Sequence, residues 1–229
     1  MNILLNTKNI FKKIYHKTLG QYRLSALLEK ELEEGTTILD VGCGRCSPLK
    51  DVRKKCYKVG LDIYEPYILK SKKLRIHDEY VVGDARTLPF PSNSFDYVIA
   101  IEVIEHLTKS DGLKMIKEME RIAKKKIILT TPNGFLPAYA GPEDNPSEKH
   151  ISGWTVNEFK QLNFSVYGLN GWKYLWKLEN GRSVLRFKPK LLCKLLVVFT
   201  EIFVYNYPSV AFQLLCVKKI KKIIKFNKS

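Results

Sequence analysis

The strongest constraint on the fold of this chain is one short segment, Ile38 to Gly44, which reads ILDVGCG. Its apolar first half predicts a buried strand, and its Gly-x-Gly half predicts a tight turn that opens a helix. Glycine lets a backbone approach a ligand closely, and free N–H groups at a helix start bind polar or anionic groups. The segment therefore predicts a strand, a turn and a helix with a ligand site at the turn.

Two later segments end in an acidic residue in the same way. Val59-Gly60-Leu61 leads to Asp62, whose carboxylate can accept hydrogen bonds from both ribose hydroxyls of a nucleoside. Val82-Gly83 leads to Asp84, which can accept a hydrogen bond from the exocyclic amine of adenine. Together with Asp40, these acidic strand ends predict one nucleoside-binding edge of a sheet.

Short β-rich segments alternate with helical ones along the chain, and this alternation predicts an α/β fold with a mostly parallel sheet covered by helices on both faces. Seven strands are expected, near residues 37–41, 58–63, 80–82, 95–101, 126–130, 164–168 and 211–217. No internal repeat or Gly/Ser linker divides the 229 residues, so a single domain is expected. Its parts are a helical extension (1–34), a cofactor-binding core (35–135), and a part with the substrate-side loop, helices, last strands and basic tail (136–229).

Charge and cysteine content bear on partners and location. The net charge of +16 favours anionic partners, either RNA or a membrane surface. Five scattered cysteines do not form a disulfide framework, and Asn6 and Lys8 interrupt the apolar N-terminus before it reaches signal-peptide length. A cytoplasmic location is expected, with a peripheral place at the membrane as the alternative. The oligomeric state stays open.

An apolar stretch at residues 191–205 predicts a helix that is too short and too charged to span a bilayer. The pattern favours a helix that covers the substrate side of the sheet or makes a dimer contact. The alternative is a helix that lies in the membrane interface beside Arg186, Lys188 and Lys190.

Several runs together resemble the class I S-adenosylmethionine-dependent methyltransferases of types 11 and 23: LDVGCG, the Asp62 strand end, GDARTLPFPSNSFDYVIAIEVIEHL and TTPNG. The resemblance covers about residues 36–135 and implies a Rossmann-like fold with S-adenosylmethionine as cofactor. Cys46 stands where many members have a third glycine. The resemblance implies that the cofactor contacts Asp40, Gly42, Cys43, Gly44, Asp62, Ile63, Asp84, Ala85, Ile101 and Glu102.

Other proteins share parts of this signature. A nicotinamide dehydrogenase would require a third glycine at Ser47 to cradle a pyrophosphate, which S-adenosylmethionine lacks. Cys43-Gly44-Arg45-Cys46 has the spacing of a thioredoxin-like redox site, but that reading gives the acidic strand ends no role. A zinc site would need a second Cys/His pair at ligand spacing, which the sequence does not offer. The methyltransferase reading is therefore preferred.

Glu102, Glu105 and His106 stand at i, i+3 and i+4, which places them on one face if the segment is helical. With His150 they could hold Mg²⁺ against two substrate oxygens, as in the metal-assisted RNA 2′-O-methyltransferases and quinone O-methyltransferases that carry a similar Glu-x-x-Glu-His. The sequence favours a site without metal, in which His106 and His150 are the candidate general bases for a hydroxyl acceptor.

The acceptor region is expected after the fifth strand, where residues 131–146 are rich in Gly, Pro and Asn. Tyr139 and Trp154 could line an acceptor pocket, although packing is the commoner role of such aromatics. Thr155 and Glu158 predict a capped helix from Val156. The leading hypothesis is methyl transfer to a small-molecule or lipid-like acceptor, at oxygen. The alternatives are a metal-assisted RNA 2′-O-methyltransferase and a non-catalytic protein that binds S-adenosylmethionine.

Overall fold

A computed structural model describes residues 23–137, 145–179 and 182–221. A seven-stranded sheet runs through it in the order β3-β2-β1-β4-β5-β9-β6. The first five strands in this order are parallel, and β9 is antiparallel to both of its neighbours. The strands are β1 (Thr37–Val41), β2 (Tyr57–Asp62), β3 (Glu79–Val82), β4 (Phe95–Ile101), β5 (Ala123–Pro132), β6 (Ser165–Trp172) and β9 (Ala211–Lys219). The expected Rossmann-like sheet and its seven strands are confirmed.

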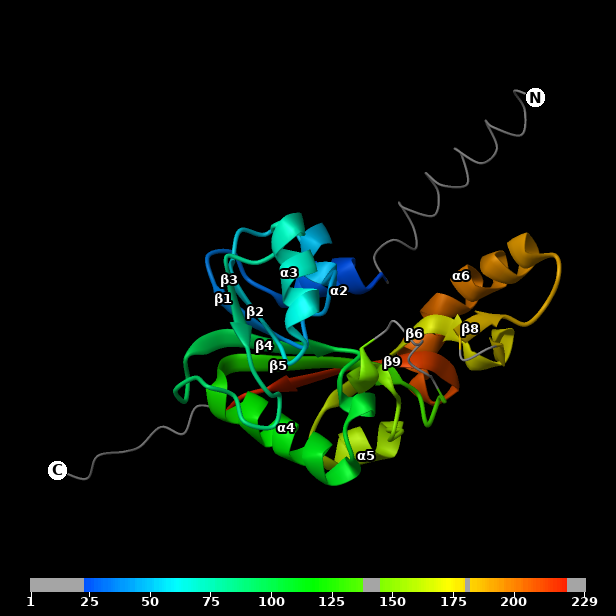
Figure 1. Cartoon of the computed structure of the whole chain (residues 1–229). Helices are drawn as coiled ribbons and strands as arrows, with labels where there is room; N and C mark the ends of the chain where they lie inside the picture. The colour runs from blue at the N-terminus through cyan, green and yellow to red at the C-terminus, as the bar shows by residue number, and fades with distance from the viewer. Residues whose placement is uncertain (1–22, 138–144, 180–181, 222–229) are drawn as a thin grey trace.

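Helices cover the sheet from both sides, with α2 and α3 on one side and α4 and α5 on the other (Figure 1). The α-helices are α2 (Leu24–Glu31), α3 (Glu65–Leu74), α4 (Lys109–Ile122), α5 (Val156–Gln161) and α6 (Lys190–Asn206). The 3₁₀ helices are η3 (Pro48–Asp51), η4 (Ile104–His106), η5 (Pro146–Glu148), η6 (Lys173–Leu175) and η7 (Pro208–Val210). The predicted helix at 191–205 is confirmed as α6. No helix in the described part of the chain is long and apolar enough to cross a membrane.

The central strands β1 and β4 lie between two apolar clusters. Leu39 and Val98 belong to the cluster that packs against α4, whereas Ile38 and Tyr97 belong to the cluster that packs against α2. Successive side chains of a strand point to opposite faces, so a strand covered on both sides must be apolar at nearly every position. This is why the ILDV segment is the plainest strand signal in the sequence.

Two features differ from the sequence-based expectation. The glycine turn does not open an α-helix but leads into the four-residue 3₁₀ helix η3, which Ser47 caps by accepting the Leu49 N–H at 3.2 Å. A longer helix has no apolar face to pack, because Arg53-Lys54-Lys55 follows.

The structure also has an unexpected hairpin of two four-residue strands, β7 (Trp176–Glu179) and β8 (Arg182–Leu185). Of the expected N-terminal helical extension, α2 is the described helix, and residues 1–22 lie outside the described ranges.

Replacing Thr155 with alanine is expected to destabilise the protein by about 1 kcal/mol. Thr155 caps α5 because its side chain accepts the Glu158 N–H, and the Glu158 carboxylate accepts the Thr155 N–H at 2.8 Å in return. Urea unfolding followed by circular dichroism measures the loss. Thr155→Ser keeps the cap and should retain most of the stability, so an equal loss in both variants would contradict the capping explanation.

Candidate functional site

A cleft of about 540 Å³, here called the first cleft, opens where β1, β2 and β4 end. The carboxyl ends of parallel strands are where such sheets bind ligands. The ten residues that the resemblance assigns to a cofactor all line this cleft: Asp40, Gly42, Cys43, Gly44, Asp62, Ile63, Asp84, Ala85, Ile101 and Glu102. His106 lines it as well, whereas His150 does not.

The glycine turn forms one wall of the first cleft. Gly42 and Gly44 both have positive φ angles, 68° and 58°, which side chains rarely adopt. A Cβ on Gly42 would lie 2.4 Å from Val103 Cγ2, so there is also no space for a side chain. The Gly42 and Cys43 amides donate to Leu61 O at 2.7 and 2.9 Å, which holds the turn against the end of β2.

Asp62 organises the opposite wall of the cleft. It is 7% exposed, its Oδ2 accepts the Gly44 N–H at 2.8 Å, and its Oδ1 accepts the Tyr64 N–H at 2.8 Å. Burial raises the pKa of this carboxyl, while the two backbone donors lower it. Because each carboxylate oxygen can accept more than one hydrogen bond, Asp62 can bind a diol without releasing either amide.

Asp40 pairs with a residue that the sequence analysis did not single out. Its Oδ2 lies 2.8 Å from His77 Nε2, and both side chains are almost fully buried. His77 precedes β3 and carries no motif, so only the folded sheet brings it to the end of β1. The pair holds the Asp40 carboxylate beneath the first cleft.

Asp84 lies at the rim of the first cleft and binds Arg86. Its Oδ1 accepts from the Arg86 backbone amide at 2.8 Å, and the Arg86 guanidinium contacts both carboxylate oxygens. The guanidinium lowers the pKa of Asp84. Tyr67 on α3 and Glu148 also line the first cleft, and the Tyr67 hydroxyl donates to Glu148 Oε1 at 2.5 Å. This hydrogen bond bridges one side of the cleft opening.

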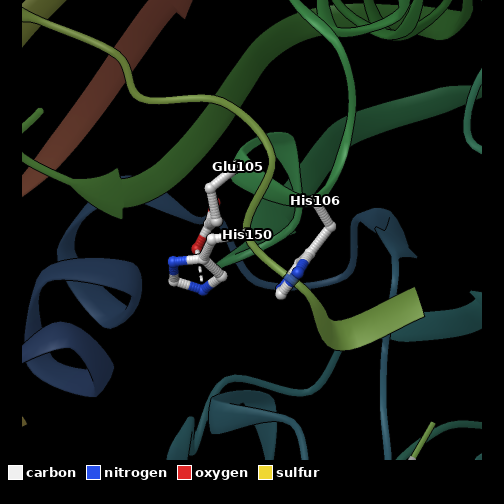
Figure 2. Close-up of side chains that lie close together, drawn as sticks. All are labelled: Glu105, His106 and His150. Atoms are coloured by element: carbon white, nitrogen blue, oxygen red, sulfur yellow. Dashed lines mark ion pairs between the residues drawn. The ribbon is translucent and has the colours of Figure 1, made fainter. Parts of the chain in front are cut away.

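Three of the four candidate metal ligands converge beside η4, the 3₁₀ helix that follows β4 (Figure 2). One ligand atom each from Glu105, His106 and His150 lies within 4.8 Å of the others, and the two imidazoles meet edge to face. Glu102 is not part of this group. The reason is local, because η4 begins only at Ile104 and the backbone at Glu102 is not helical but has a positive φ of 56°. The Glu102 carboxyl instead accepts from Thr130 Oγ1 at 2.9 Å.

Hydrogen bonds fix the orientation of both imidazoles. His150 Nδ1 lies 2.7 Å from Leu136 O, and His106 Nδ1 lies 3.3 Å from Lys149 O. A carbonyl only accepts hydrogen bonds, so the short contact assigns the proton of His150 to Nδ1 and leaves the lone pair on its Nε2. Burial lowers the pKa of both histidines, and in His106 the neighbouring His150 lowers it further.

The Glu105 carboxyl is 1% exposed. Its Oε2 accepts from Thr131 Oγ1 at 3.0 Å, and its Oε1 has no hydrogen-bond partner among the residues that the structure describes. Burial raises the pKa of Glu105, and the charge of Glu102 raises it further. Glu105 Oε1 lies 4.0 Å from His150 Nε2, and a buried carboxylate oxygen beside two imidazoles is a donor set that suits a divalent cation (Figure 2).

The burial of Cys43 argues against a thioredoxin-like redox site at Cys43 and Cys46. All five cysteines are free. Cys43 is buried, and burial raises the pKa of its thiol, whereas redox-active thiols have lowered pKa values.

A second cleft of about 680 Å³ adjoins the first. Both clefts are lined by Cys46, Ser47, Pro48, Ile101 and Glu102. The second cleft extends to α6 and to the ends of β6 and β9, where its lining includes Leu169, Asn170, Val197, Val198, Glu201 and Gln213. Its lining is mixed, because Leu169, Val197 and Val198 share it with charged side chains that include Arg23, Lys50 and Asp51.

Glu201 is the titratable group at the α6 side of the second cleft. It is half-buried, and its Oε1 accepts the Asn170 N–H at 3.0 Å. Burial raises the pKa of Glu201 to about 7, a value at which a carboxylate can take a proton near neutral pH. Glu201 could not be singled out from the sequence, because a glutamate on an apolar helix carries no motif.

Trp154 is not a wall of either cleft. It is 2% exposed and packs against Phe159, and a Cβ on Gly112 would lie 2.6 Å from its ring. Trp154 therefore has the packing role that the sequence favoured and does not line an acceptor pocket, since the side chain belongs to the core cluster that packs against α4. Tyr139, the other aromatic candidate, lies outside the described residues.

Comparison with known proteins points to one family. The family model for a methyltransferase domain matches residues 39–130. A tRNA (carboxymethyluridine(34)-5-O)-methyltransferase of Arabidopsis thaliana is 32% identical over 58% of this chain, and this chain spans 30% of its length. A demethylmenaquinone methyltransferase of Listeria welshimeri is 27% identical over 71% of this chain and 70% of its own length. A crystal structure of a SAM-dependent methyltransferase from Methanosarcina mazei has a TM-score of 0.56 at 16% identity, covering 84% of this chain and 96% of the other.

Proposed function

We propose that this chain, which belongs to the class I S-adenosylmethionine-dependent methyltransferases, transfers the methyl group of its cofactor to a hydroxyl of a small, lipid-like acceptor. S-adenosylmethionine would occupy the first cleft, with the ribose at Asp62, the adenine at Asp84 and Ala85, and the methionine part at the glycine turn. The acceptor would enter the second cleft. One relative named above is a demethylmenaquinone methyltransferase, which is compatible with an apolar acceptor.

The observation that carries this proposal is the junction of the two clefts. Ile101 and Glu102 at the end of β4, together with Cys46 in the loop after β1, line both. A ligand in each cleft would therefore meet at these residues. Methyl transfer needs the acceptor atom about 3–3.5 Å from the methyl carbon and in line with the sulfur, and two adjoining clefts can hold the two reactants in this way.

The chemistry demands little beyond positioning and a proton acceptor. A lone pair of the acceptor oxygen forms the new C–O bond while the S–C bond breaks, and the sulfonium leaves as a neutral thioether. The hydroxyl proton must pass to a base, for which Glu201 stands in the second cleft. His106 in the first cleft and His150 behind it are the alternative bases, and their neutral imidazoles could also accept a proton.

The Glu105, His106 and His150 cluster has the donors for a divalent cation, because three ligand atoms converge and Glu105 Oε1 has no hydrogen-bond partner in the described part of the chain. Bound there, a divalent ion would supply Lewis acidity for a substrate oxygen. Imidazole with carboxylate suits Mn²⁺ or Zn²⁺ better than Mg²⁺, so Mn²⁺ is the appropriate probe.

Mn²⁺ is expected to bind the purified protein with about one equivalent, and His150→Ala is expected to weaken this binding at least about tenfold. Electron paramagnetic resonance of free Mn²⁺ measures binding without any turnover. Glu148→Gln is the control, since this carboxylate lies nearby but outside the cluster. Equal Mn²⁺ binding by wild type and His150→Ala would rule out the cluster as the metal site.

A transfer assay tests the proposed function directly. The protein is incubated with S-adenosylmethionine that carries a tritiated methyl group and with either prenylated phenols or total tRNA. Label in the organic extract of the phenol reaction supports the proposal. Label in precipitated RNA would favour the RNA methyltransferase instead, and calorimetric binding of the cofactor without transfer to either class would favour a non-catalytic binding protein.

A further inference from the structure

Helix α6 has two different faces. Its inner face packs on β6, where a Cβ on Gly168 would lie 2.1 Å from Val204 O and one on Gly171 would lie 2.7 Å from Val197 O. The same side of the helix supplies Val197 and Glu201 to the second cleft. The helix is therefore anchored by close backbone contact with two glycines.

The outer face of α6 is apolar and exposed. Leu191 and Phe199 are 70% and 71% exposed, the highest values among the large apolar side chains of the described residues. The exposed set recurs at helical spacing, so it forms one stripe, and it consists of Leu191, Leu192, Leu196, Phe199, Ile202 and Phe203. A contiguous apolar stripe of this kind marks an interaction surface rather than ordinary exposure.

Basic side chains stand at the start of α6 and on the segments before it, and on the helix itself Lys190 and Lys194 share the side of Val197 rather than that of the stripe. Exposed cations stand on η6, beside β8 and on the first turns of α6, namely Lys173, Arg186, Lys188, Lys190 and Lys194. None of these five has a carboxylate within ion-pair distance among the residues that the structure describes. The nearest acidic residues along the chain are Glu179, which pairs with Lys177, and Glu201, which lines the second cleft.

Aromatic side chains stand on the same part of the chain. Trp172 and Tyr174 pack against each other and are 42% and 51% exposed, and Phe187 packs against Tyr174. Tryptophan and tyrosine are enriched where protein meets the lipid headgroup region, since their rings have an apolar body and a polar edge. An apolar helical stripe with exposed cations and interfacial aromatics nearby is the pattern of a helix that lies in an anionic membrane surface.

We propose that the outer face of α6 docks on an anionic phospholipid surface. This inference rests on the proposed function in one respect: a lipid-like acceptor dissolved in that membrane would reach the second cleft beside the helix whose inner face lines it. The docking itself depends only on the stripe and its cations, so it can be tested without cofactor or acceptor.

Vesicle flotation of the full-length protein tests the surface. The wild type is expected to float with vesicles of phosphatidylcholine and phosphatidylglycerol and much less with phosphatidylcholine alone. Leu191→Ser combined with Phe199→Ser should weaken binding at least about tenfold, because both side chains lose their burial in lipid. Lys190→Glu combined with Lys194→Glu should weaken binding to the anionic vesicles only. The control is Leu69→Ser with Leu113→Ser, exposed apolar positions on α3 and α4.

Each outcome decides between membrane and other occupants. Equal flotation of the wild type and the Leu191→Ser, Phe199→Ser variant would overturn the proposal. If the wild type does not float, and sedimentation equilibrium shows a dimer that this variant converts to monomer, the stripe is a self-association surface and the proposal is overturned. Methylation of detergent-dispersed acceptor without vesicle binding would leave the proposed function intact and overturn the docking. Vesicle binding without methylation would support the docking alone.

Discussion

Replacing Asp62 with alanine is expected to weaken S-adenosylmethionine binding about a hundredfold, which corresponds to about 2.7 kcal/mol. The expected loss has two sources. A hydrogen bond to a charged acceptor is worth about 1.5–3 kcal/mol, and Asp62 can accept the ribose hydroxyls. The variant also releases the Gly44 and Tyr64 amides, which Asp62 holds at 2.8 Å. Isothermal titration calorimetry measures the change in affinity.

A matched control separates cofactor binding from damage to the sheet. Asp78 also accepts a backbone amide of β2, that of Lys58 at 2.7 Å, but it does not line the first cleft. Asp78→Ala should therefore bind the cofactor like the wild type. Because burial raises the pKa of Asp62, its acceptor form is lost as the pH falls, and affinity should decline on the acid side. Equal weakening in both variants would refute the assignment of Asp62 to the ribose.

Local sequence patterns predicted the fold and the first cleft because each pattern records a local physical requirement. Burial on both faces of β1 and β4 requires continuous apolar runs, and the turn requires glycine at Gly42, where the backbone has a positive φ and Val103 leaves no space. Parallel strands end at the same edge, so three strand ends were enough to place the acidic residues around one cleft. The sequence could also have signalled the missed β7–β8 hairpin, since Asn180-Gly181 is a strong two-residue turn signal.

The remaining site residues are brought together only by long-range packing. His77 reaches Asp40 across 37 positions, and Asn170 reaches Glu201 across 31. No spacing rule connects such pairs, and each residue alone looks like an ordinary surface or core residue. The prediction that Glu102 shares a helical face with Glu105 and His106 failed for a local reason. It assumed that the helix begins directly after β4, whereas the backbone at Glu102 is left-handed.

Replacing Glu201 with glutamine is expected to lower kcat about a hundredfold above neutral pH, as removal of a general base does. The amide preserves the shape of the side chain, and its oxygen can still accept the Asn170 N–H. Since burial raises the pKa of Glu201 to about 7, only the ionised form above that pH can take the acceptor proton. The wild-type rate should therefore rise with pH through about 7, and this rise should vanish in the variant.

The pH profile and a stability measurement distinguish a proton acceptor from a structural residue. Glu29→Gln is the control, because this carboxylate on α2 also accepts a backbone amide, that of Arg53 at 2.7 Å, outside both clefts. The pKa of Glu201 is higher in the folded than in the unfolded protein, so its contribution to stability is full at low pH and is lost as the pH rises through about 7. Glu201→Gln should therefore gain stability relative to the wild type above pH 7 while it loses activity. A variant that loses activity but keeps the wild-type pH profile would show that Glu201 does not take the proton, and the same assay on His106→Ala would then test the alternative base.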